Sequence, residues 1–122
     1  MVDERTFEYV VLRYAPNPLT EEFRNMSIVF FDPLDLQTGF CKIRFVRDWK
    51  WKVLSIDPDA DVVMLESLLK EIERRLGEPN SRQDVLDLIE DSFSNVVRVS
   101  DRQTIRSNSP ELALEDLLSR LS

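Results

Sequence analysis

The sequence predicts an α+β fold, a small and mainly antiparallel sheet of about four strands with three helices packed largely on one face. Aromatic and β-branched residues fill short segments of the first half, separated by proline-rich or glycine-containing turns. The second half instead carries leucine and isoleucine at helical spacing. The length of 122 residues is typical of one domain, so we expect a single α+β domain over residues 1–122.

Four strands are predicted. The first is apolar at both parities, which is typical of a central strand that is buried on both faces. Short connections between the first three strands favour an antiparallel meander. The fourth can join this sheet either at an edge or in the centre. The predicted strands cover residues 7–14, 26–31, 40–46 and 95–100.

Three helices are predicted in the second half. In the first, Asp57 suits the N-cap, Pro58 suits the first helical position, and Gly77 follows the end. Ser109 and Pro110 begin the third helix. Because the three apolar stripes need a common apolar surface, we expect the helices to cover one face of the sheet. The stripes consist of Leu65, Leu68, Leu69, Ile72 and Leu76; of Val85, Leu86, Ile89 and Phe93; and of Leu114, Leu117, Leu118 and Leu121.

The composition excludes several classes of site. No histidine is present, so a Ser-His-Asp triad and histidine metal ligands are excluded, and the single cysteine, Cys41, excludes a thiolate zinc site. Gly39 and Gly77 are the only glycines, so glycine-rich phosphate loops are absent. The lone cysteine and the lack of an apolar leader or membrane segment indicate a cytoplasmic protein.

One acidic triplet has the spacing of a metal loop. Asp57, Asp59 and Asp61 alternate as in a calcium-binding EF-hand, but that loop needs glycine at its sixth position and glutamate at its twelfth. Val62 and Leu68 occupy those positions. We therefore interpret the triplet as an acid-rich helix start and expect no metal and no cofactor.

A basic and aromatic segment, residues 42–52, contrasts with the overall net charge of −7. Trp49 and Trp51 alternate in it with Lys50 and Lys52, so an extended chain would form one apolar and one basic face. Such a segment is a solvated strand face, a surface for an acidic protein, or a groove for single-stranded nucleic acid. The acidic net charge disfavours nucleic acid. We expect a protein partner to contact Arg47 and Lys50.

Five arginines of the predicted sheet and its exits form a second candidate site. Together they predict a pocket for a phosphate or a carboxylate, with one member close to the start of the last helix, where free N–H groups favour anions. The alternative is that they pair with the eleven acids of residues 57–91. These candidates are Arg13, Arg44, Arg98, Arg102 and Arg106.

Two stretches near the start of the chain resemble the first motifs of a known family. They are residues 7–16, Phe-Glu-Tyr-Val-Val-Leu-Arg-Tyr-Ala-Pro, and then Glu22-Phe23-Arg24-Asn25. They resemble a bacterial family of domains of unknown function, number 3037 in that series, and the resemblance continues through Arg44 and the acids of 57–61 to the last helix. Ser27 occupies a position where the family often has glycine. The resemblance implies no activity, but some members are encoded near HipA-like serine/threonine kinases.

The missing catalytic residue types and the acidic character favour a non-enzymatic protein-interaction or regulatory module. The resemblance implies a HipA-like kinase as a partner. The alternative is a protein or enzyme that binds a small anion or a nucleotide through arginines and carboxylates.

Overall fold

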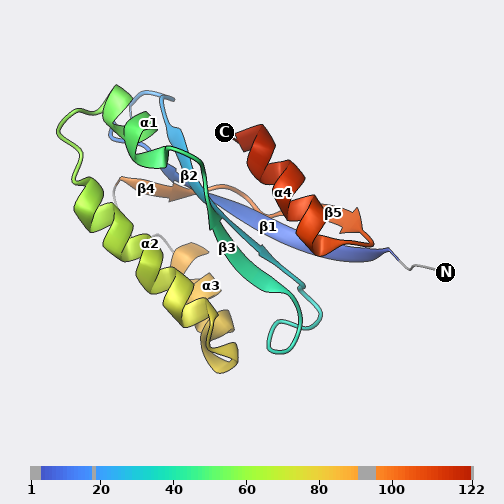
Figure 1. The fold of residues 1–122 in the computed structure, drawn as a ribbon. Coiled ribbons are helices and arrows are strands. Elements are labelled where there is room, and N and C mark those ends of the chain that lie inside the picture. The colour runs from blue at the N-terminus through green and yellow to red at the C-terminus, as the bar shows by residue number, and fades with distance from the viewer. Residues whose placement is uncertain (1–3, 18, 91–95, 122) are drawn as a thin grey trace.

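A five-stranded antiparallel sheet with helices on both faces forms the described part of the chain (Figure 1). The computed structural model describes residues 4–17, 19–90 and 96–121. The strands are β1 (Arg5–Tyr14), β2 (Arg24–Phe31), β3 (Cys41–Phe45), β4 (Val97–Val99) and β5 (Gln103–Ser107). The helices are α1 (Trp49–Ile56), α2 (Val62–Leu76), the short 3₁₀ helix η1 (Pro79–Ser81), α3 (Arg82–Glu90) and α4 (Pro110–Leu121).

β1 lies in the centre of the sheet. It pairs with β2 on one side, and β2 pairs with β3, which confirms the predicted meander. On the other side, the second half of β1 pairs with β4 and its first half pairs with β5. β5 was not expected, because four of the five residues in Gln103–Ser107 are polar and do not form an apolar strand pattern.

The helices divide between the two faces (Figure 1). α1, α2 and α3 cover one face, where their apolar residues form the larger core with Val10, Leu12 and Val29. The predicted α+β class with a mainly antiparallel sheet is confirmed. The helix at the C-terminal end, however, packs on the opposite face, where Leu114 and Leu117 contact a smaller core around Phe30. No helix in the described part of the chain is long and apolar enough to cross a membrane.

The expected extended segment around the tryptophans is wrong, because residues 49–56 form α1. Trp49 and Trp51 therefore point in different directions, as the helical turn of about 100° per residue requires. Trp49 is 6% exposed and belongs to the larger core, whereas Trp51 is 75% exposed. The segment thus does not form one apolar and one basic face.

The predicted start of the first of the three expected helices at Asp57 is also wrong. Asp57 ends α1, and its carboxylate accepts a 2.6 Å hydrogen bond from the Tyr14 hydroxyl. α2 begins only after Asp61, whose side chain caps it by accepting from the Met64 N–H at 2.9 Å. The two ends of the acidic triplet therefore serve two different helices.

The apolar stripe of α2 is otherwise as predicted. Leu65, Leu69, Ile72 and Leu76 are buried, while Leu68 is only half-buried at the margin of the larger core. In α3, Val85, Leu86 and Ile89 are buried as expected, and the fourth expected member, Phe93, lies outside the described residues.

Candidate functional site

β3 has one edge that no other strand of the described chain covers. The backbone N–H and C=O groups of its even-numbered residues point toward β2. At the two ends of the ladder, the Asp32 N–H donates to the Phe40 carbonyl and the Val46 N–H donates to the Met26 carbonyl, both at 2.8 Å. In an antiparallel ladder the intervening residues direct their N–H and C=O groups to the other side. The backbone groups of residues 41, 43 and 45 therefore face outward.

Two hollows flank this edge, one on each face of the sheet. The α2-side hollow, of about 200 Å³, lies between β3 and the end of α2 and is lined partly by Cys41, Ile43 and Leu76. The α4-side hollow, of about 250 Å³, is lined partly by Phe40 and Leu112. Both hollows are lined by apolar and by charged side chains. The charged lining residues are Lys42, Arg44, Glu73 and Arg82 in the first and Lys42, Arg44, Glu111 and Glu115 in the second.

Lys42 and Arg44 line both hollows and give the edge its positive charge. The Lys42 ammonium lies 5.2 Å from the Phe40 ring centroid and 3.9 Å from the Glu111 carboxylate. Within the described ranges Arg44 forms no ion pair, and it donates instead to the Ile43 carbonyl at 3.3 Å. The edge therefore carries an arginine whose charge no carboxylate of the described residues neutralises at close range.

Cys41 belongs to the core rather than to a reactive site. It shares the apolar face of its strand with Ile43 and Phe45. Burial raises the pKa of the Cys41 thiol, although the nearby Arg82 guanidinium acts in the opposite direction. The thiol is therefore held in its neutral form, which is a poor nucleophile.

Arg82, which was not among the predicted site residues, lines the α2-side hollow. Its guanidinium donates to the carbonyls of Leu36 (2.9 Å), Gln37 (3.2 Å) and Gly39 (3.2 Å), and also to the carbonyl of Leu76 (2.8 Å). It thereby connects the β2–β3 loop to the end of α2. An arginine at a helix start gives no sequence signal for such long-range contacts.

The other bases of the segment 42–52 do not join the β3 edge. Arg47 is exposed in the loop before α1 and has its Nε 4.0 Å from Asp48. Lys50 forms a hydrogen-bonded ion pair with Glu66 that links α1 to α2. The hydrogen bond from Lys50 lowers the pKa of the Glu66 carboxyl. Lys50 thus has a structural partner within the chain.

Arg102 and Arg106 pair with acids close to them in space. Arg102 bridges Glu90, at 2.6 Å, and Glu8, at 3.0 Å. Arg106 lies 4.0 Å from Glu4. Only one of these acids, Glu90, belongs to the acidic region 57–91 that the sequence analysis considered as the alternative to an anion pocket.

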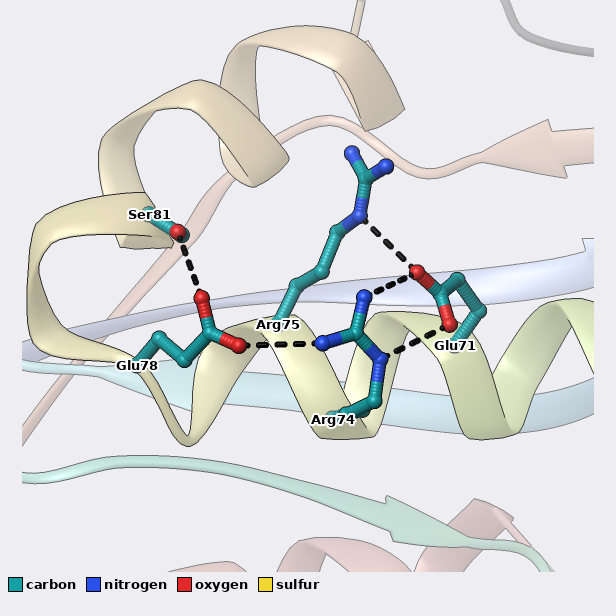
Figure 2. Close-up of polar contacts among 5 residues, drawn as sticks. All are labelled: Glu71, Arg74, Arg75, Glu78 and Ser81. Carbon is teal, nitrogen blue, oxygen red and sulfur yellow. Dashed lines mark hydrogen bonds and ion pairs between the residues drawn. The ribbon is translucent and has the colours of Figure 1, made fainter.

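Two other acids of that region, Glu71 and Glu78, pair with arginines of the last turns of α2, as Figure 2 shows. Glu71 accepts from Arg74 at 2.6 Å and from Arg75 at 3.1 Å. Arg74 also donates to Glu78 at 3.0 Å, and Ser81 donates to the second oxygen of Glu78. The hydrogen bonds from Arg74 and then Arg75 lower the pKa of Glu71 to about 2.

Arg13 and Arg98 are the two arginine candidates that the fold brings directly together. They are opposite residues of the β1–β4 ladder and line a hollow of about 440 Å³. Arg44 lies on β3, beyond β2, and does not line that hollow. The five predicted arginines therefore divide into an adjacent pair, two members paired with acids, and one at the β3 edge.

The aspartates of the acidic triplet have roles in the fold. Asp57 accepts from Tyr14, Asp61 caps α2, and the backbone N–H of Asp59 donates to Asp57 Oδ1 at 3.2 Å. Nowhere in the described chain do three or more acids or cysteines gather in a way that could hold a metal ion.

One known protein family matches nearly the whole chain. The model of the family described as "Protein of unknown function (DUF3037)" matches residues 9–121. The chain belongs to the DUF3037 family. The match spans β1 to α4, so the β3 edge and the Arg13–Arg98 hollow both lie inside the DUF3037 region. Neither the curated proteins nor the solved structures include a match to this DUF3037 member.

Proposed function

We propose that this DUF3037 protein is a non-enzymatic interaction module that binds an extended acidic segment of another protein along β3. The observation that carries the proposal is the uncovered edge of β3, with two hollows beside it and Lys42 and Arg44 along it. An added strand would gain main-chain hydrogen bonds from the outward groups, and its alternate side chains would enter the two hollows.

The charges on the edge determine what kind of strand it suits. Lys42 and Arg44 lie on the α4 face, so acidic side chains of the added strand belong on that face, opposite them. Cys41 and Ile43 lie on the α2 face, where apolar side chains belong. We therefore expect a partner segment in which acidic and apolar residues alternate.

A second copy of this chain fits the edge less well. If two β3 strands paired antiparallel about Ile43, Lys42 of one copy would lie opposite Arg44 of the other. Like charges directly opposite in a ladder are destabilising. Edge lysines also protect isolated sheets from such pairing. Charge complementarity thus favours an acidic strand over self-association.

The first partner to test is a HipA-like serine/threonine kinase. Its support is the resemblance described in the sequence analysis, in which some family members are encoded near such kinases. On this proposal an acidic and apolar segment of the kinase would occupy β3. Co-purification with the kinase should be lost in the double variant Lys42→Glu/Arg44→Glu. It should be retained in Arg47→Glu, because the proposal moves the expected partner contact from Arg47, which is exposed before α1, to the β3 edge.

A sharper test uses a defined probe and the alternation of the ladder. A synthetic peptide of alternating glutamate and valine is titrated against the 122-residue protein, and amide hydrogen exchange is followed residue by residue. The amides of Cys41, Ile43 and Phe45 should gain protection, while those of Lys42 and Arg44, already bonded to β2, should change little.

The same peptide with lysine in place of glutamate is the matched control and should bind at least tenfold more weakly, which is about 1.4 kcal/mol. Binding of the glutamate peptide should also weaken as salt is added. Equal binding of both peptides, protection at residues outside β3, or a dimer whose formation requires β3 would each refute the proposal.

A further inference from the structure

Two arginines face each other at the end of the sheet that lies away from the β3 edge. Arg13 on β1 and Arg98 on β4 are direct partners in the antiparallel ladder. Such partners have Cβ atoms about 4.5–5.5 Å apart, and like charges in these positions destabilise the sheet. Among the residues that the structure describes, neither arginine has a carboxylate within 4.0 Å. The fold therefore holds two neighbouring cations without a close counter-charge.

The surroundings of Arg13 hold its guanidinium in place. The guanidinium carbon lies 4.5 Å from the centroid of the Phe23 ring, and Nε donates to Asn25 Oδ1 at 3.2 Å. Stacking on one face and a hydrogen bond at Nε leave the two terminal amino groups without another partner in the described chain. Two parallel N–H donors of this kind match the oxygens of a phosphate or a carboxylate.

A β-bulge lies beside the pair. The β1–β2 register shifts between Leu12 and Arg13, so that Leu12 is opposite Ser27 whereas Arg13 is opposite Asn25. Bulges of this kind redirect side chains and are frequent next to functional sites. Without the bulge, the residue opposite Arg13 would be Met26. With the bulge it is Asn25, whose amide oxygen accepts from the guanidinium and orients it.

The two arginines open into a hollow of about 440 Å³, large enough for an anion with an attached organic group. Its apolar lining comes from Ala15, Phe23 and Val99, and its polar lining includes Thr20. Glu21 and Glu22 also line it, so a ligand must compete with these carboxylates for the arginines.

We infer that the Arg13–Arg98 hollow binds a phosphate group, either as inorganic phosphate or as a small phosphate monoester. A phosphate dianion neutralises both arginines and offers enough oxygens to accept from two guanidinium groups at once. A carboxylate neutralises only one of them and matches a single guanidinium. This site lies on different strands from the β3 edge and is independent of the function proposed above.

The test measures binding of inorganic phosphate to the full chain by isothermal titration calorimetry at constant ionic strength, adjusted with sodium chloride. Arg98→Gln should weaken binding at least tenfold, because it removes one of the two guanidinium groups. Arg47→Gln makes the same change in charge at an exposed arginine outside the hollow and should leave binding unchanged. Glu22→Gln should strengthen binding, since it removes a competing carboxylate.

A further variant, Arg98→Lys, separates charge from geometry, and it should bind with an affinity between those of the wild type and Arg98→Gln. Phosphoserine distinguishes the source of the phosphate: a monoester site binds it more tightly than inorganic phosphate, and a site for free phosphate does not.

Three outcomes would overturn the inference. One is phosphate binding that is the same in Arg98→Gln and the wild type. Another is a phosphate titration that releases or absorbs no more heat than a titration with sodium chloride at the same ionic strength. The third is a double-mutant cycle in which Arg98 and Glu22 stabilise each other in the absence of phosphate, which would show that the arginine is neutralised within the chain. Melting curves of each variant establish that it is folded before it is titrated.

Discussion

Two serine hydroxyls, both close to β1, have opposite hydrogen-bonding situations. The Ser100 hydroxyl accepts from the backbone N–H of Val11 at 2.8 Å and donates to the Asp101 carbonyl at 3.1 Å. It completes the β1 ladder at the corner between β4 and β5. The Ser27 hydroxyl on β2 is fully buried and has no partner in the described part of the chain.

The two serines give a matched pair of substitutions. Ser27→Ala should be neutral or stabilise the fold by up to about 1 kcal/mol, because it removes a buried polar group that has no hydrogen bond. Ser100→Ala should cost about 1–3 kcal/mol, because it leaves the buried N–H of Val11 without an acceptor. Urea denaturation of both variants checks this, and a larger cost for Ser27→Ala than for Ser100→Ala would contradict it.

Because of Tyr14, the stability of the fold should vary with pH in the alkaline range. Burial, with the hydrogen bond to Asp57, raises the pKa of Tyr14 to about 12 from its ordinary value of 10.0. Between these values the unfolded chain loses the proton while the folded chain keeps it. The contribution of Tyr14 is therefore complete below pH 10 and is lost as the pH rises toward 12.

The variant Tyr14→Phe isolates this effect. It should be less stable than the wild type by about 1.5–3 kcal/mol at pH 8, because it loses a hydrogen bond to a charged group. The difference should shrink as the pH rises from 10 to 12. Urea midpoints of both proteins at several pH values measure it, and a difference that stays constant across this range would show that the hydroxyl does not titrate as described.

At the scale of the elements, single contacts decide how helices and loops are placed. The guanidinium of Arg82 at the start of α3 accounts for four carbonyl contacts to the β2–β3 loop and the end of α2. Gly39 in that loop could not carry a side chain, since a Cβ there would lie 2.3 Å from the Asp35 carbonyl oxygen. The tight loop and the arginine together support one end of β3.

The substitution Arg82→Lys tests this support. A lysine keeps the charge but cannot reach four carbonyls from one planar group, so the fold should lose about 2 kcal/mol or more. Arg47→Lys is the matched control and should change stability by less than about 0.5 kcal/mol, because its side chain is 90% exposed. Thermal melts of the two variants give the comparison, and equal melting temperatures would show that the Arg82 contacts contribute little.

The prediction from sequence succeeded for elements with a strong local pattern and failed where distant contacts decide. The α2 stripe and the meander were identified because leucine spacing and β-branched runs specify them. The period-two pattern of Trp49–Lys52 indicated a strand, but α1 forms there without a side-chain cap and with Trp49 buried in the core. The contacts of Arg82 could not be predicted, and the predicted arginine group could not be narrowed to the adjacent pair Arg13 and Arg98, since both depend on strand order and on the packing of distant segments.

At the scale of the whole molecule, the sheet separates two cores of unequal size. The larger core lies under α1, α2 and α3, and the smaller one lies under α4, where Phe7 and Phe30 stack with ring centroids 5.3 Å apart. The sequence predicted the apolar stripes but not that the stripe of the last helix would cover the opposite face of the sheet. An apolar stripe indicates that one side of a helix is buried. Which face of the sheet buries it depends on the path of the chain.

Both cores should be required for stability. Ile72→Ala in the larger core and Leu117→Ala in the smaller core should each cost about 2–5 kcal/mol, because both side chains are buried. Leu34→Ala, at a side chain that is 91% exposed, serves as the control and should cost less than about 0.5 kcal/mol. A cost below about 1 kcal/mol for Leu117→Ala in urea denaturation would mean that α4 contributes little to the fold.

The central position of β1 has a consequence for synthesis on the ribosome. β1 emerges first and β2 and β3 follow soon after, but Arg5 finds its partner only in Ser107, and Leu12 only in Val99. One side of the strand therefore remains without its ladder while most of the chain is being translated. Non-local pairing of this kind slows folding, and an open apolar strand attracts other nascent chains. Chaperones that shield nascent chains would thus have to protect β1 until β4 and β5 have been made.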